Sequence, residues 1–69
     1  MKQRIGIVGG GQLGRMLAQA AHKLGFFVTV LDPTPDGPAG QVADAQIVGS
    51  FKDKDKILEL ANVSDYITF

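Results

Sequence analysis

The stretch Ile5–Gly14, IGIVGGGQLG, decides the fold, because a short apolar run passes directly into three consecutive glycines. Read as Gly9-x-Gly11-x-x-Gly14, it has the spacing of a tight turn that joins a buried strand to a helix around a bound phosphate. Glycine accepts positive φ and has no Cβ to keep a ligand from the backbone. The N–H groups and dipole of the following helix favour an anion at the same place. The stretch therefore predicts a phosphate contact, or else a turn whose glycines serve only close helix–sheet packing.

Strand and helix patterns alternate along the whole chain. We expect strands at Arg4–Val8, Phe26–Leu31, Ala45–Val48 and Asp65–Phe69. Helices are expected at Gln12–Leu24 and from Ser50 or Asp53 to about Asn62. Between these elements we expect a loop at Asp32–Pro38 and a short turn at Gly40–Val42. This alternation predicts an α/β fold with a four-stranded parallel sheet, flanking helices and right-handed crossovers. Such an arrangement is one half of a doubly wound, Rossmann-like domain.

Apolar periodicity predicts which side of each helix packs on the sheet. In the first helix the apolar positions at helical spacing are Leu13, Met16, Leu17, Ala20 and Leu24, whereas Arg15, Gln19, His22 and Lys23 fall outside that stripe. Gly25 stands where a left-handed helix cap is expected. The second helix is expected to bury Ile57, Leu58 and Ala61, with Ser50 or Asp53 as its cap.

Size and composition limit the classes of protein. The 69 residues predict a single domain, residues 1–69, and seven basic side chains balance seven acidic ones. Nothing therefore points to nucleic acid or an acidic membrane surface, and no apolar stretch approaches the ~20 residues of a membrane span. The chain contains no cysteine, and we expect a cytoplasmic protein. Because Tyr66–Phe69 reads as a strand with no turn or polar tail after it, we expect a domain truncated at its C-terminal end.

Several polar residues lie near the carboxyl ends of the predicted strands, where ligands bind in such sheets. Asp32 has the position of an acidic residue that binds the ribose of NAD, but an Asp-Pro turn explains it as well. Gln12 and Arg15 could reach a ligand oxygen or phosphate, or lie solvated on the helix. Asp44 either braces its loop or contacts a ligand, and His22 is expected to be a surface histidine.

No catalytic constellation is present in the sequence. There is no cysteine, only one histidine, no carboxylate pair at a useful spacing and no Gly-x-x-x-x-Gly-Lys-Ser/Thr phosphate loop. The chain is therefore expected to bind and position a ligand, and it is not expected to be active alone.

The glycine stretch and its neighbours resemble one enzyme family. Residues Ile5–Met16, together with Leu31–Pro33, Pro38–Ala39, Gln41–Asp44 and Tyr66–Phe69, are similar to the amino terminus of the N5-carboxyaminoimidazole ribonucleotide synthetases. The resemblance covers essentially the whole chain. It implies a three-domain ATP-grasp ligase of purine biosynthesis, of which this chain is the amino-terminal, pre-ATP-grasp domain.

The same resemblance implies the site and the partners. Gly10, Gly11, Gln12 and Leu13 are candidates for lining the pocket of the substrate, aminoimidazole ribonucleotide. Bicarbonate is the second substrate, and ATP and Mg²⁺ are held by the other two domains of a homodimeric enzyme. No catalytic residue, cofactor site or metal site is expected in residues 1–69, and an acidic substrate contact is expected beyond them.

Three other classes of protein stay open. The glycine spacing with Asp32 also suits an NAD(P)-binding domain of a dehydrogenase. A sister ATP-grasp enzyme acting on another purine intermediate is a further alternative, although its glycine loop tends to differ from Gly-Gly-Gln-Leu. The last alternative is a small α/β binding module without an enzymatic parent.

Overall fold

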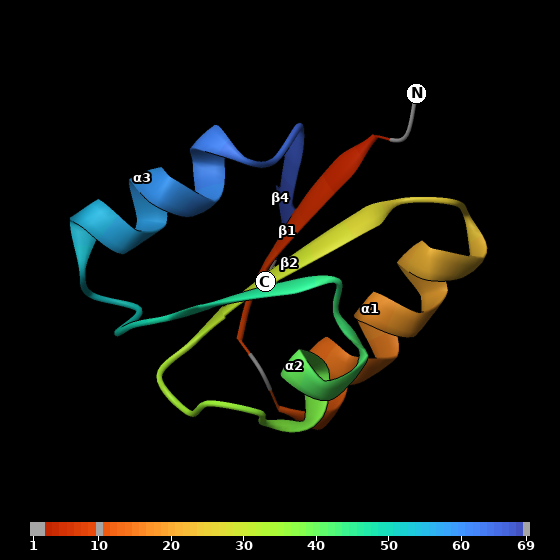
Figure 1. Ribbon diagram of the computed structural model, residues 1–69, viewed down its shortest axis with the longest axis horizontal. Helices are drawn as coiled ribbons and strands as arrows, with labels where there is room; N and C mark the ends of the chain where they lie inside the picture. The colour runs from red at the N-terminus through yellow and green to blue at the C-terminus, as the bar shows by residue number, and fades with distance from the viewer. Residues whose placement is uncertain (1–2, 10, 69) are drawn as a thin grey trace.

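Four parallel strands form one sheet in the order β3-β2-β1-β4 (Figure 1). The computed structural model describes residues 3–9 and 11–68 of the chain. The strands are β1 (Arg4–Val8), β2 (Phe27–Asp32), β3 (Ala45–Val48) and β4 (Tyr66–Thr68), and the helices are α1 (Gln12–Lys23), α2 (Pro38–Val42) and α3 (Lys54–Asn62). The predicted α/β fold with a four-stranded parallel sheet is confirmed. Phe69, the last residue of the predicted fourth strand, lies outside the described residues.

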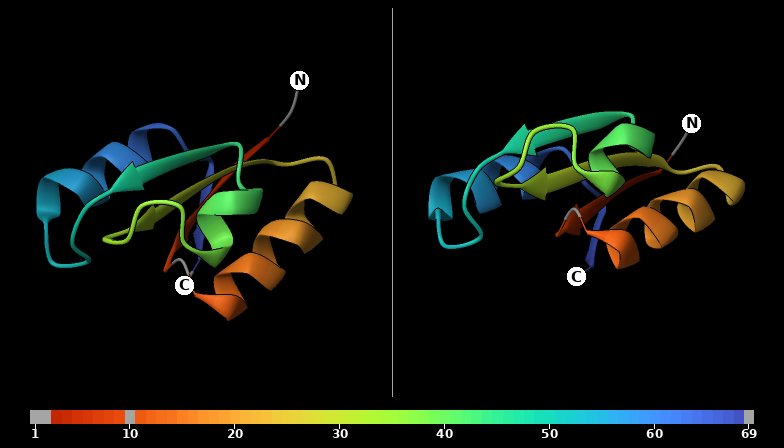
Figure 2. Two further views of the ribbon diagram at one scale, coloured as in Figure 1. Left: turned by 60° about the horizontal axis from the view of Figure 1, so that its bottom comes forward. Right: turned by 90° about the horizontal axis from the view of Figure 1, so that it is seen from below.

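Helices cover both faces of the sheet. Helices α1 and α2 lie on one side of the strands and α3 lies on the other (Figure 2). The core under α1 and α2 is built from apolar residues of β1, β2 and the two helices: Ile7, Ala18, Ala21, Val28, Val30 and Ala39. Strands covered on both faces read as nearly continuous apolar runs, as β1 and β2 do here. This arrangement brings the carboxyl ends of β1 and β2 to one edge of the sheet, beside the start of α1.

The packing face of α1 differs from the predicted one. The residues of α1 that are buried are the small ones, Gly14, Ala18 and Ala21. The predicted stripe is largely exposed, with Leu13 at 76% and Met16 at 56% of their full accessible surface. Small side chains let the helix axis approach the sheet closely, and the larger apolar residues lie on a more exposed side of the helix.

The packing face of α3 also differs from the prediction. Leu60 is the buried residue of this helix, whereas Leu58 is exposed and Ile57 is half-buried. Ala61, predicted to be buried, is exposed as well. Leu60 lies over Gly6 of β1, where a Cβ would approach the Leu60 Cγ atom to 2.9 Å. The absence of a side chain at residue 6 therefore makes room for Leu60 and sets the rotation of the helix.

The start of α3 and the end of α1 show the expected local chemistry. Asp53 is the N-cap of α3, and its Oδ1 atom accepts hydrogen bonds from the backbone of Asp55 at 3.0 Å and of Lys56 at 3.4 Å. Gly25, just after α1, has φ +86° and confirms the predicted left-handed residue. The predicted short turn at residues 40–42 is part of α2, a five-residue helix that begins at Pro38.

Candidate functional site

The glycine turn connects the carboxyl end of β1 to the start of α1, as predicted. Gly9 has φ +114°, a conformation that side chains rarely adopt, and its backbone nitrogen donates to the carbonyl of Leu31 at 2.9 Å. Gly11 is the N-cap of α1. Gly14 is buried so closely against the turn that a Cβ at this position would overlap the Gly9 carbonyl oxygen. The turn is thus tied to β2 and covered by the first turn of α1.

Three of the four predicted site residues, Gly11, Gln12 and Leu13, lie together at the start of α1. Apart from the chain neighbours of Gly11 and the backbone of its own helix, no described residue has a heavy atom within 4 Å of the position that a Cβ of Gly11 would occupy, so a ligand can approach this part of the backbone. Gln12 and Leu13 form the exposed beginning of the helix. Gly10, the remaining predicted residue, lies outside the described residues. The first N–H groups of a helix have no partner within it, and no acidic residue occupies the first turn of α1. These features suit an anionic ligand.

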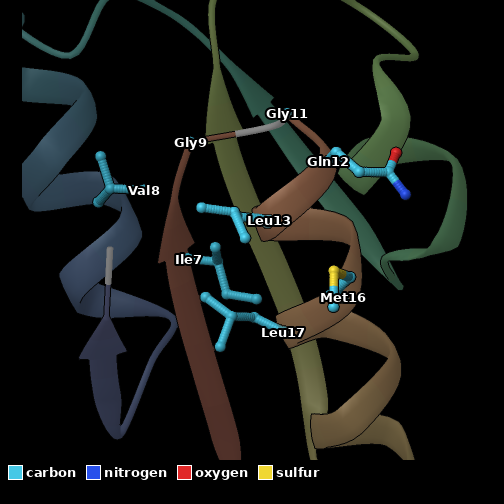
Figure 3. A pocket seen from close by; sticks show the side chains of 9 residues that line it. Ile7, Val8, Gly9, Gly11, Gln12, Leu13, Met16 and Leu17 are labelled. Atoms are coloured by element: carbon cyan, nitrogen blue, oxygen red, sulfur yellow. The ribbon is translucent and has the colours of Figure 1, made fainter.

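An open groove of about 650 Å³ lies beside this turn, between α1 and β1 (Figure 3). Its apolar side chains come from both elements: Ile7, Val8, Leu13, Met16 and Leu17. Leu13 and Leu17 project toward Ile7, while the Gln12 amide points in another direction (Figure 3). Gln12 is the only polar side chain among the described residues that line the groove.

The groove and the turn differ in the chemistry that they offer. Hydrocarbon side chains cannot hydrogen-bond a phosphate, and burying a charge among them is costly. They do suit the face of a flat ring or another apolar surface. The backbone at Gly11 and Gln12 offers the polar contacts instead. The site therefore fits a ligand with an apolar part and an anionic part, and ribonucleotides combine these two features.

Asp32 takes part in the turn that follows β2. Its Oδ1 atom accepts a hydrogen bond from the backbone nitrogen of Thr34 at 2.8 Å. This contact is the Asp-Pro turn interpretation of the sequence, in which the side chain caps its own loop. The structure brings Asp32 to the same edge of the sheet as the glycine turn and engages its carboxylate within the loop.

Asp44 and His22 form a contact between α1 and the start of β3. The Asp44 Oδ2 atom lies 2.7 Å from Nε2 of His22 and accepts a hydrogen bond from the backbone nitrogen of Val28 at 2.7 Å. Asp44 therefore braces its loop, as one of the two predictions had it. His22 is partly exposed, as expected of a surface histidine, and it also has this specific partner.

An ion pair stabilises the sheet at the amino ends of its strands, away from the glycine turn. Arg4 and Asp65 join the beginnings of β1 and β4, with 3.2 Å between Arg4 Nη2 and Asp65 Oδ1. The hydrogen bonds from Arg4 hold the pKa of the Asp65 carboxyl below its usual value. Within residues 3–9 and 11–68, no group of three or more His, Cys, Asp or Glu side chains gathers as a metal-binding cluster. No helix in this same part of the chain is long and apolar enough to cross a membrane.

Met16 and Leu17 line the groove, although apolar periodicity predicts that they pack on the sheet. A signal was available in the small residues Gly14, Ala18 and Ala21, which also recur at helical spacing and mark a closely packed face. Gln46 of β3 was not predicted either, because its hydrogen bonds to the backbone of Thr34 and Asp36 depend on the path of the loop that contains them.

Comparison with known proteins gives the family. The model of the ribonucleotide synthetase preATP-grasp domain matches residues 1–69. The N5-carboxyaminoimidazole ribonucleotide synthase of Bacillus subtilis is 51% identical over 65 residues, which are 94% of this chain and 17% of that protein. The crystal structure of the synthetase from Thermotoga maritima superposes with a TM-score of 0.92 at 57% identity, over 94% of this chain and 18% of that one.

A third similar protein was crystallised with ligands. The N5-carboxyaminoimidazole synthase of Aspergillus clavatus, in complex with ADP and 5-aminoimidazole ribonucleotide, superposes with a TM-score of 0.84 at 40% identity, over 96% of this chain and 18% of that one. The chain therefore spans 17–18% of the length of these relatives. On the match to its family model and these identities, the chain belongs to the ribonucleotide synthetase preATP-grasp domain family.

Proposed function

We propose that this chain is the substrate-side domain of an ATP-dependent carboxylating ligase. The complete protein would convert 5-aminoimidazole ribonucleotide and bicarbonate to N5-carboxyaminoimidazole ribonucleotide in purine biosynthesis. The observation that carries the proposal is the exposed backbone at Gly11 and Gln12 beside an apolar groove, in a chain 51% identical to a synthase of that name. The Aspergillus clavatus relative, crystallised with ADP and 5-aminoimidazole ribonucleotide, supports this choice of substrate.

In this proposal the described residues of the chain bind and orient the ribonucleotide. Gly11, Gln12 and Leu13 form one wall of its pocket, together with Gly10 as predicted from the family resemblance. ATP and Mg²⁺ are assigned to the other domains of the complete protein, where carboxyphosphate would form from bicarbonate. The exocyclic amine of the ribonucleotide then takes up the carboxyl group as phosphate leaves. We also propose that the complete protein is a homodimer and that it acts in the cytoplasm. Both of these features rest on the family resemblance alone.

The engagement of Asp32 favours this function over nicotinamide binding. A dehydrogenase domain would use an acidic residue at this position to hold the ribose hydroxyls. Here the carboxylate accepts a hydrogen bond from Thr34 of its own loop. An NADH titration followed by amide chemical shifts separates the two functions, since saturable shifts around Asp32 would support the dehydrogenase.

The ATP turnover of the complete protein tests the proposal. We expect ADP to form only when 5-aminoimidazole ribonucleotide and bicarbonate are both present. Glycinamide ribonucleotide with formate serves as the control, because a sister ATP-grasp enzyme would accept that pair. ATP turnover that does not respond to 5-aminoimidazole ribonucleotide would refute the proposed function.

A further inference from the structure

A side-chain amide from β3 holds the loop that follows β2. Gln46 donates from Nε2 to the carbonyl of Thr34 at 2.8 Å, and its Oε1 atom accepts from the backbone nitrogen of Asp36 at 3.2 Å. Asp36 has φ +55°, a left-handed conformation that aspartate tolerates better than most residues. One side chain thus binds the backbone on both sides of Pro35 and fixes the path of residues 33–37.

Two neighbouring side chains complete this arrangement. Asp32 accepts from the backbone of Thr34 at 2.8 Å, and the Gln41 amide donates to the carbonyl of Asp36 at 2.9 Å. The backbone N–H and C=O groups of residues 34 and 36 are therefore all bound by side chains. A loop held in this way is a rigid element, although it has no regular secondary structure.

The position of the Gln46 amide depends on Gly40 of α2. A Cβ on Gly40 would overlap the Gln46 Oε1 atom and would lie 2.9 Å from its Cδ atom. The φ angle of Gly40 lies outside the left-handed region, so the backbone at this position would accept alanine. Glycine at this position leaves room for the amide that binds the loop, and a larger residue would displace that amide.

The same helix contacts the glycine turn. The Cβ of Ala39, the residue before Gly40, lies 3.3 Å from the position that a Cβ of Gly14 would occupy. Ala39 is fully buried. Gly14 in turn packs against the carbonyl of Gly9. Gln46, the beginning of α2 and the glycine turn are therefore closely packed one against the next.

We propose that Gln46 is a positioning residue for ribonucleotide binding, acting through loop 33–37 and α2 on the glycine turn. This inference rests on the proposed function, because it assigns the ribonucleotide to that turn. Catalytic and binding geometry needs a supporting layer that locks the residues in contact with the ligand. Gln46 supplies that support from β3, and Gly40 leaves the space in which it does so.

Two variants of the complete ligase test this role from two different elements. Gln46→Ala removes both hydrogen bonds to the loop, and Gly40→Ala displaces the same amide while placing a better helix former in α2. The matched control is Gln19→Ala, a glutamine that is exposed on α1. Initial rates are measured while 5-aminoimidazole ribonucleotide and ATP are varied in turn, and the melting temperature of each variant is recorded.

We expect KM for the ribonucleotide to rise roughly threefold to tenfold in both variants, the size expected when about one net hydrogen bond of positioning is lost. KM for ATP and kcat stay within twofold of the wild type in the same experiment. The control Gln19→Ala leaves kcat and both KM values unchanged. An unchanged ribonucleotide KM in both variants would overturn the inference. An equal rise in KM for both substrates, together with a lower melting temperature, would overturn it as well, since that pattern indicates general damage to the fold. If the unmodified ligase shows no dependence on the ribonucleotide, the proposed function fails instead.

Discussion

A Cβ atom on Gly14 would overlap the carbonyl oxygen of Gly9, so the first turn of α1 rests directly on the strand-to-helix turn. This contact explains why the spacing of the glycines matters in this chain. Gly9 allows the backbone to reverse, and Gly14 lets the helix pack on the reversed segment. Gly11 lies between them with open space around it, available to a ligand.

Gly14→Ala is expected to destabilise the fold by about 3 kcal/mol, the upper part of the range for overpacking. The reason is that the overlapping atom belongs to the backbone of Gly9 and cannot rotate away. Urea denaturation followed by circular dichroism measures the effect. Gly11→Ala is the matched control, and it should cost no more than about 1 kcal/mol, the difference between glycine and alanine at an N-cap. Equal stability losses in the two variants would show that Gly14 has no special contact.

Asp53→Ala should lower the free energy of unfolding by about 1 kcal/mol. The Asp53 side chain accepts from two backbone N–H groups at the start of α3, and alanine leaves these donors without that partner. Asp53→Asn keeps a capping oxygen and should retain most of the stability. Loss of stability in the asparagine variant equal to that in the alanine variant would argue against a capping role.

Asp44→Ala is expected to cost about 1–3 kcal/mol, because the backbone nitrogen of buried Val28 loses its acceptor. His22→Ala removes only the partly exposed partner and should cost less than about 1 kcal/mol. Denaturation of the two variants side by side gives the comparison. A larger effect at His22 than at Asp44 would mean that the contact between these side chains, and not the bond to Val28, stabilises this corner.

The Arg4–Asp65 pair predicts a pH dependence of stability. Because the pKa of Asp65 is lower in the folded chain than its ordinary value of 3.8, the pair stabilises the fold above that value. This contribution is lost as the pH falls through the lower, folded-state pKa. Both side chains are exposed, so the effect is small and weakens with salt. The stability difference between wild type and Asp65→Asn should shrink between about pH 6 and about pH 3. A difference that grows on acidification would contradict the pairing.

The strands could be predicted well because their chemistry is local. The bounds of β1 and β3 agree with the expected Arg4–Val8 and Ala45–Val48, and Gly25 caps α1 as its type and position indicate. Parallel strands buried on both faces leave continuous apolar runs that are easy to recognise. The turn at Asp32 was also open to prediction, because an Asp-Pro pair stabilises its own loop.

The faces of the helices could not be predicted in the same way. Periodicity finds every position that shares a face, but it does not say which of two faces packs on the sheet. In α1 the close approach allowed by Gly14 decided the matter, and Leu13 was left exposed in the groove. In α3 the space above Gly6 decided it in favour of Leu60. The contacts of Gln46 needed the three-dimensional path of the loop as well.

The most direct test of whether the glycine turn lines the ribonucleotide pocket is the KM for 5-aminoimidazole ribonucleotide in a complete ligase that carries Gly11→Ala. The added methyl group enters the open space beside the turn, where it overlaps no other residue. We expect this KM to rise at least about tenfold while KM for ATP stays unchanged, since only the ribonucleotide approaches this backbone. An unchanged ribonucleotide KM, or a rise in KM for ATP alone, would contradict the assignment of the glycine turn to the ribonucleotide.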